Sequence, residues 1–267
     1  MILRRLMEHV RTQNWFAVAL DFVIVVAGIW VALMAGQWSE GRQKRIDLAL
    51  AEREINLEIA MNYYNAYERL SIAPCRKARY AELGEMLLES EPQWPGSPGP
   101  YGDGLLTKHR VFPPALRSSL WYWSSRAWDT ALAQGILDVL EQEKRDQLTF
   151  LFETVKSAAA AQNDIYRIES RLQVLTYPSQ MTMSDRLRYY DALAEADAIS
   201  AGLELFAEQI TEQIESDSLL NLPDDVEAEM RAAVAAANTN VNDPYGDCRS
   251  GIVLPLLQTE AREEDAE

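Results

Sequence analysis

The sequence contains only two histidines and two cysteines among its 267 residues. Structural zinc sites take four ligands, mostly from these two residue types, and the metalloprotease pattern H-E-x-x-H is absent. The histidines, His9 and His109, lie far apart in the sequence. The nucleophile motif G-x-S-x-G and a glycine-rich phosphate-binding loop are also missing. We therefore expect no catalytic residues, no metal and no cofactor, and predict that the protein is not an enzyme.

Positive charge is scarce as well. Aspartate and glutamate number 41 against 25 lysines and arginines, which gives a formal net charge of −16. The phosphates of nucleic acids repel a chain this acidic, so binding to DNA or RNA is not expected.

The period-2 alternation of a half-buried strand is missing after residue 38. Apolar residues recur instead at spacings of three and four, as on one face of a helix. The pattern predicts an all-α fold, in which one N-terminal transmembrane helix precedes an antiparallel bundle of long helices. The helices expected after residue 38 are 39–70 (ended by Pro74), 76–89, 118–134 (stopped by Gly135), 136–175, 184–222 (capped by Ser184) and 224–237.

One long apolar run, Trp15 to Trp38, dominates the N-terminal part of the chain. Asp21 is its only ionisable residue. At a rise of about 1.5 Å per residue the run is roughly 36 Å long, enough to cross a hydrocarbon core of about 30 Å. Tryptophan at both ends suits the headgroup layers. We interpret the run as a transmembrane helix. A cleaved signal peptide is the alternative, although the run is long for one and no good cleavage site follows it.

The membrane helix divides the chain into segments. Lysines and arginines flank the apolar run in equal numbers, so their count does not set its orientation. A short basic N-terminus stays inside easily, which favours an outward-facing body. The expected organisation is 1–14, a short basic cytoplasmic segment; 15–38, the membrane helix; 39–257, a helical extracytoplasmic domain with a proline- and glycine-rich loop at 91–114; and 258–267, an acidic tail.

The two cysteines, Cys75 and Cys248, both follow the membrane helix. In an oxidising compartment outside the cytoplasm they can pair. We predict a disulfide between them, and the alternative is two unrelated buried thiols.

One face of the membrane helix carries small residues. At 100° per residue, Asp21, Gly28, Ala32 and Gly36 fall close to one line. Small residues spaced by four let a second helix backbone approach closely, and a carboxyl group is better tolerated at a helix–helix contact than facing lipid. We predict that this face packs on another transmembrane helix, from a second copy or a different membrane protein. The alternative is that Asp21 reaches back to the nearby headgroup layer.

The loop at 91–114 is too rich in proline and glycine for a long regular element. Its aromatic residues Trp94, Tyr101 and Phe112 are candidate anchors for a partner. The alternative is a flexible surface excursion.

The N-terminal segment resembles an uncharacterised family of single-pass bacterial envelope proteins. Such proteins have a helix with an early acid, a V-x-x-G-I-x-x-A-like core and a closing W-x-E. The matching residues here are Asp21, Val25, Gly28, Ile29, Ala32, Trp38 and Glu40, and residues 127–155 are similar to the family's helix–glycine–helix hairpin. The resemblance implies the bacterial inner membrane, with a cytoplasmic N-terminus and a periplasmic body. It carries no activity.

Two functions are compatible with these features. The first is a non-enzymatic accessory or scaffold subunit that engages a membrane partner through its transmembrane helix. The alternative is an extracytoplasmic ligand-sensing helical module that works with a separate transducer. A pocket lined by Trp121, Trp128 and polar groups would favour the second function, and a bare apolar surface patch the first.

Overall fold

A computed structural model describes residues 15–89, 93–96, 122–239 and 250–257. The chain divides into two compact units, residues 1–50 and 51–267. In chain order the elements are α2 (Trp15–Leu88), β1 (Gln93–Trp94), α4 (Arg126–Ala133), η2 (Ile136–Val139), α5 (Gln142–Leu172), η3 (Gln173–Thr176), β2 (Ser179–Gln180), α6 (Met183–Ser216), α7 (Asp224–Thr239) and η5 (Pro255–Leu257). The described part of the chain is therefore all-α apart from two short strands, which confirms the all-α part of the predicted fold.

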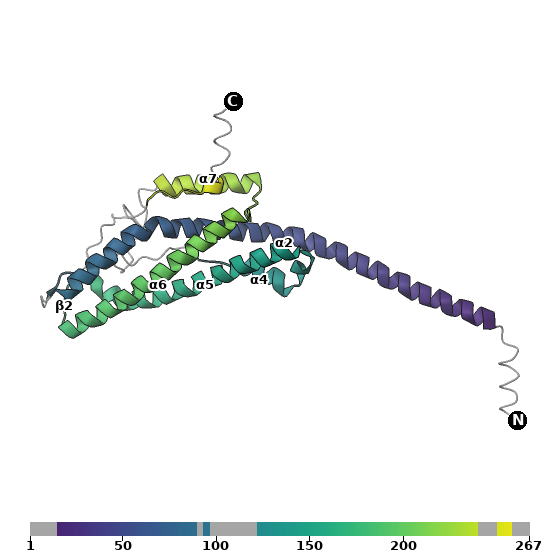
Figure 1. Ribbon diagram of the computed structural model, residues 1–267, viewed down its shortest axis with the longest axis horizontal. Helices are drawn as coiled ribbons and strands as arrows, with labels where there is room; N and C mark the ends of the chain where they lie inside the picture. Colours follow the sequence, from purple (N-terminus) through teal and green to yellow (C-terminus); the bar gives the residue numbers. More distant parts are fainter. Residues whose placement is uncertain (1–14, 90–92, 97–121, 240–249, 258–267) are drawn as a thin grey trace, which may run out of the picture. The chain divides into compact units, whose positions relative to one another are not determined.

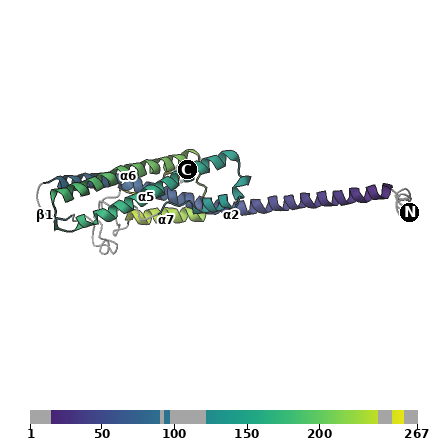
Figure 2. The same cartoon turned by 90° about the horizontal axis from the view of Figure 1, so that it is seen from below.

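The second unit is built on three long helical segments, the part of α2 after residue 50, α5 and α6, which lie side by side in Figures 1 and 2. Hydrogen bonds set their directions. Tyr63 near the middle of α2 bonds Glu215 near the end of α6, and Arg186 near the start of α6 bonds the carbonyl of Met86. Thus α2 and α6 are antiparallel.

Helices α5 and α6 are antiparallel as well. Near one end of the pair, Gln213 donates to the carbonyl of Gln147, and near the other end Arg171 pairs with Glu195. Helix α6 is therefore antiparallel to both α2 and α5, as predicted.

The other pair, α2 and α5, runs in the same direction, because Lys144 near the start of α5 pairs with Glu52, and Leu172 at its end lies in one cluster with Leu83.

Local signals set most helix ends. Gly135 has φ of 65°, a left-handed conformation that suits glycine, and α4 ends just before it as predicted. Thr182 caps α6, since its hydroxyl accepts from Asp185 N–H while the Asp185 carboxylate accepts from Thr182 N–H. The cap is therefore Thr182, and the expectation of Ser184 was wrong by two residues.

Pro74 does not end the first helix, contrary to the prediction. A proline inside a helix lacks an N–H and displaces the carbonyls of the preceding turn. Here the carbonyl of Ser71 accepts from the N–H of Ser250 at 3.3 Å and from its hydroxyl at 2.9 Å. The C-terminal segment thus bonds the helix where proline weakens it, and α2 continues to Leu88.

Two other predicted helices are shorter than expected. The chain from Tyr122 to Ser125 is irregular, and α4 begins only at Arg126 rather than at residue 118. The helix predicted over 136–175 is divided, because Leu140 and Glu141 take extended backbone between η2 and α5.

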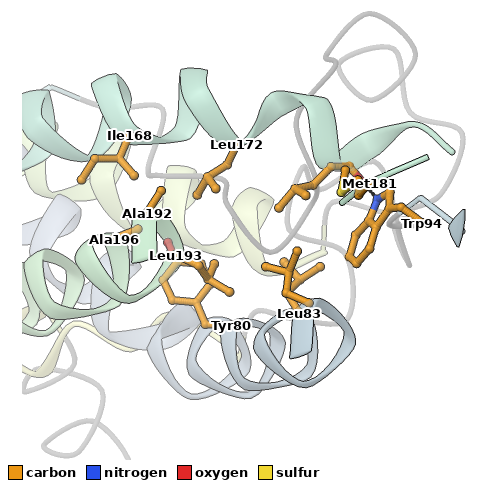
Figure 3. Close-up of a cluster of buried hydrophobic side chains, with 11 residues drawn as sticks. Tyr80, Leu83, Trp94, Ile168, Leu172, Met181, Ala192, Leu193 and Ala196 are labelled. Carbon is orange, nitrogen blue, oxygen red and sulfur yellow. Dashed lines mark hydrogen bonds between the residues drawn. The ribbon is translucent and has the colours of Figure 1, made fainter. Parts of the chain in front are cut away.

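One end of the bundle holds a cluster of buried apolar side chains (Figure 3). Helix α2 contributes Tyr80, Leu83 and Leu87, and the other members come from β1, α5, η3 and α6 and from Met181 between β2 and α6. The strands pair antiparallel, with Trp94 opposite Ser179, and so hold β1 against this cluster.

The C-terminal segment closes over the bundle. Asn238 at the end of α7 makes two hydrogen bonds with the backbone of Ile252, one to its carbonyl and one from its N–H. Ile252, Leu254 and Leu257 are buried.

Candidate functional site

The N-terminal part of α2 is apolar and uncovered. Its large side chains from Phe16 to Trp38 are exposed, including Phe22 at 68 %, Trp30 at 61 % and Leu33 at 61 %. By length and composition α2 can cross a membrane, and it is the one such helix among the described residues. A soluble domain rarely exposes so long an apolar surface to water.

The structure places the four predicted packing residues on this uncovered surface. Asp21, Gly28, Ala32 and Gly36 are all exposed. A Cβ atom added at Gly28 or Gly36 would meet nothing within 4 Å. Because a continuous α-helix turns by about 100° per residue, the four positions share one face of α2. This face offers a shallow surface of small residues with one carboxyl group beside it.

Only one of the two cysteines lies among the described residues. Cys75 is half-buried in α2, one residue after Pro74, and Cys248 lies outside the described residues. Ser250 hydrogen-bonds the carbonyl of Ser71, one helical turn before Cys75. The chain just after Cys248 is therefore held close to Cys75.

Trp94 corrects the expectation of a partner loop. Its side chain is fully buried, its indole N–H donates to the carbonyl of Leu175 at 2.8 Å, and the Arg186 guanidinium lies over the ring at 5.9 Å. Trp94 is a core residue, so it is not available to a partner. The other two candidate anchors, Tyr101 and Phe112, lie outside the described residues.

A buried carboxylate that the sequence analysis did not single out anchors the start of α4. Glu58 on α2 accepts hydrogen bonds from the Ser124 hydroxyl at 2.5 Å, from Ala127 N–H at 3.0 and 3.1 Å, and from Trp128 N–H at 3.2 Å. The first N–H groups of a helix have no partner within it, and a negative charge there also faces the positive end of the helix dipole. Glu58 therefore caps α4 from a neighbouring helix.

Two asparagines extend this anchor. Asn62 donates to the carbonyl of Ser124 at 2.7 Å and accepts from its N–H at 3.0 Å. Asn65 donates to the carbonyl of Tyr122 at 3.1 Å. Together they bind the irregular segment before α4 as a neighbouring strand would. In the sequence, these asparagines stand at positions where the helical spacing predicts buried side chains. That spacing does not show which groups they bond.

The tryptophans of this region belong to the core. Trp128 is buried and stacks on Phe152, with ring centroids 5.2 Å apart. The indole N–H of Trp123 donates to Gln162, also buried, at 2.8 Å. A shallow depression of about 660 Å³ lies outside them, lined by residues such as Ser125, Arg126 and Asp129. It is open to solvent, unlike the enclosed pockets that hold most small ligands.

A layer of buried charge crosses the bundle between α2 and α6. Arg76 forms an ion pair with Glu204, and Arg69, fully buried, donates to the carbonyl of Ser200 at 3.3 Å. Burial raises the pKa of Tyr80 in the same layer to about 12, with the nearby Glu169 and Asp197 acting in the same direction and Arg76 opposing them. Buried ionic groups of this kind specify which helix faces meet and contribute little net stability.

A second polar cluster joins α2 to the end of α6. The hydroxyls of Tyr63 and Tyr67 both donate to one oxygen of Glu215, at 2.7 and 2.6 Å. Burial first, and then the bond to the Glu215 carboxylate, raises the pKa of Tyr63, and the same causes raise that of Tyr67 to about 12. Both phenols therefore stay protonated at neutral pH and serve as hydrogen-bond donors.

The described residues hold no group of three or more metal-binding side chains. Both histidines lie outside the described ranges. The buried polar side chains described above, such as Glu58, Asn62 and Arg76, join one helix to another.

No family model, no curated protein and no solved structure matches this chain.

Proposed function

We propose that the protein is a non-enzymatic single-pass protein of the bacterial inner membrane, an accessory or scaffold subunit that engages another transmembrane helix through the face of Asp21, Gly28, Ala32 and Gly36. The observation that carries the proposal is the contrast within one chain. The body buries its apolar side chains, whereas the segment from Phe16 to Trp38 leaves its own exposed. A membrane supplies the missing apolar surroundings.

The face itself supports a protein partner in addition to lipid. Lipid tails cover any apolar helix, so association between membrane helices depends on close packing and polar contacts. Gly28, Ala32 and Gly36 leave room for close packing, and nothing within the described chain occupies the space beside the glycines. A carboxyl group within the membrane is costly unless it faces a neighbouring helix or water. Asp21 on the same face therefore supports a helix partner.

The helical body favours the accessory or scaffold role over the ligand-sensing role. A ligand-sensing module needs an enclosed site, and Trp128, a residue proposed to line it, is packed in the core against Phe152. The depression beside Trp123 is open and encloses little volume from solvent.

Gentle detergent extraction of the tagged full-length protein at native expression, followed by identification of the co-purifying proteins, tests the proposal. We expect a stoichiometric membrane protein complex. Recovery of the protein alone, as a monomer or homo-oligomer, would remove the accessory role and direct the search to ligands of the body. Intact mass of the same sample separates a retained membrane helix from a cleaved signal peptide.

A further inference from the structure

The segment of α2 just after the apolar run carries an isolated group of cations. Arg42, Lys44 and Arg45 follow Trp38 within two turns, in a chain of net charge −16. All three side chains are exposed. None takes part in an ion pair with another described residue, although many cations of the body do. Two acids lie close to them along the helix. Glu40 stands two residues before Arg42 and forms no ion pair with them, and Asp47, two residues after Arg45, accepts a hydrogen bond from Gln43.

The two arginines share a face with the tryptophan. At 100° per residue, Arg42 and Arg45 lie within about 40° of Trp38 around the helix, and Lys44 lies about 120° away. A cleft of about 830 Å³ runs along this face and is lined by Trp38, Gly41, Arg42 and Arg45, with apolar residues from Ile46 to Leu50 at its far end. Gly41 sits between Trp38 and Arg45 and leaves the floor of the cleft open.

The depth of this cleft matches a phospholipid headgroup. With Trp38 at the edge of the hydrocarbon, the helical rise of about 1.5 Å per residue places the backbone of Arg42 about 6 Å and that of Arg45 about 10 Å farther out. Helical side chains tilt toward the N-terminus, so the long Arg45 side chain reaches back toward the membrane. The polar layer of a bilayer extends roughly 5 to 8 Å beyond the hydrocarbon on each side. Guanidinium groups bind phosphate oxygens through paired N–H donors, and the indole N–H adds a further donor.

We propose that Trp38, Gly41, Arg42 and Arg45 form a binding site for the headgroup of an anionic phospholipid. The proposal rests on the membrane insertion proposed above. The acidic body as a whole repels an anionic surface. A preference for anionic lipid therefore has to come from these local cations, and the site selects phosphatidylglycerol over phosphatidylcholine.

Native mass spectrometry of the full-length protein in nanodiscs tests the proposal, by counting retained phosphatidylglycerol and phosphatidylcholine. Each cation at a membrane surface contributes about fivefold in lipid affinity, so Arg42→Gln and Arg45→Gln should each lower phosphatidylglycerol retention by about that factor. Lys44→Gln removes the same charge at the same depth from another face and should change retention less than twofold.

Gly41→Leu supplies a test that leaves every charge in place. A Cβ at Gly41 would meet nothing within 4 Å in the described chain, so the substitution fills the cleft without a clash inside the protein. We expect it to lower phosphatidylglycerol retention as strongly as the arginine changes. Equal retention of the two lipids, or an equal effect of Lys44→Gln and Arg42→Gln, would overturn the site. Failure of the protein to resist alkaline extraction from vesicles would overturn the membrane insertion itself.

Discussion

At the scale of single residues, the body is held together by buried polar side chains that act on backbone groups. Glu58 and Asn62 are buried on α2, and both form hydrogen bonds with the chain from Ser124 to Trp128. Removing one partner from such a contact leaves the other groups buried without a bond, which costs more than the bond contributes. The irregular entry to α4 therefore depends on a few residues of another helix.

Glu58→Gln tests this dependence. The amide presents N–H donors where Ser124, Ala127 and Trp128 already donate, so part of the cap is lost. We expect the free energy of unfolding to fall by about 2 kcal/mol, measured by urea denaturation followed by tryptophan fluorescence. Glu54→Gln, an exposed change one turn earlier on α2, should stay within about 0.5 kcal/mol of wild type. Equal stability of the two variants would show that the cap contributes nothing.

The buried Tyr80 predicts an alkaline limit to stability. Its folded pKa, raised to about 12, lies above the ordinary value of 10.0. A raised pKa contributes stability that is fully present below pH 10, and this contribution is lost as the pH rises toward 12, because the unfolded chain then releases a proton that the folded chain keeps. By pH 12 the loss from Tyr80 alone reaches about 2 kcal/mol.

Tyr80→Phe removes this ionisable group. The variant should lose less stability than wild type between pH 10 and pH 12, measured by urea unfolding of the full-length protein in detergent at a series of pH values. Tyr177→Phe, at an exposed position, is the control for loss of a hydroxyl. Parallel pH profiles for wild type and Tyr80→Phe would contradict the assignment of the buried hydroxyl.

At the scale of elements, the sequence predicted the helices where side-chain periodicity or glycine set them. The end of α4 at Gly135 and the start of α7 after Pro223 agree with the structure, because these signals act within a few residues. The errors arose where distant chain segments supply the bonds. Ser250 bonds the helix beside Pro74, and Glu58 fixes the late start of α4. Trp94, too, was predicted to be a loop anchor, but β2 pairs with its strand and η3 accepts its indole hydrogen bond.

The packing face also shows how far the sequence can predict the site. Asp21, Gly28, Ala32 and Gly36 share a face because any continuous helix would place them so, and the structure adds only that the chain leaves this face uncovered. What packs on it is a property of another molecule. The sequence alone did not indicate the cleft lined by Trp38, Arg42 and Arg45. These cations were counted there only to predict the orientation of the helix, whereas the cleft depends on which of them share a helix face.

A disulfide would tether the C-terminal segment to α2. Ser250 already bonds Ser71, so a Cys75–Cys248 link needs little further ordering of the chain. We expect maleimide-labelled membranes to show no reactive thiol until a reductant is added. Cys75→Ser, Cys248→Ser and the double variant should all lose the same stability, on the order of 2 to 5 kcal/mol, because each removes the same bond. Thiols that react without reductant would contradict both the link and the oxidising location of the body.

At the scale of the whole molecule, the chain combines a self-sufficient helical body with a helix segment that is apolar on every side. The body's core lies between α2, α5 and α6 and needs no partner for its burial. The segment from Phe16 to Trp38 has no covering element among the described residues. The central claim is therefore that the small-residue face of this segment engages another membrane helix.

The most direct test measures how much of the membrane partner co-purifies with two variants, Ala32→Leu and Ala27→Leu. Both substitutions add the same side chain, about 7.5 Å apart in depth, but Ala27 lies about 140° around the helix from Ala32. We predict that Ala32→Leu lowers partner recovery at least tenfold at equal expression and membrane insertion, whereas Ala27→Leu leaves it at the wild-type level. Equal recovery with both variants would contradict the claim that this face holds the partner.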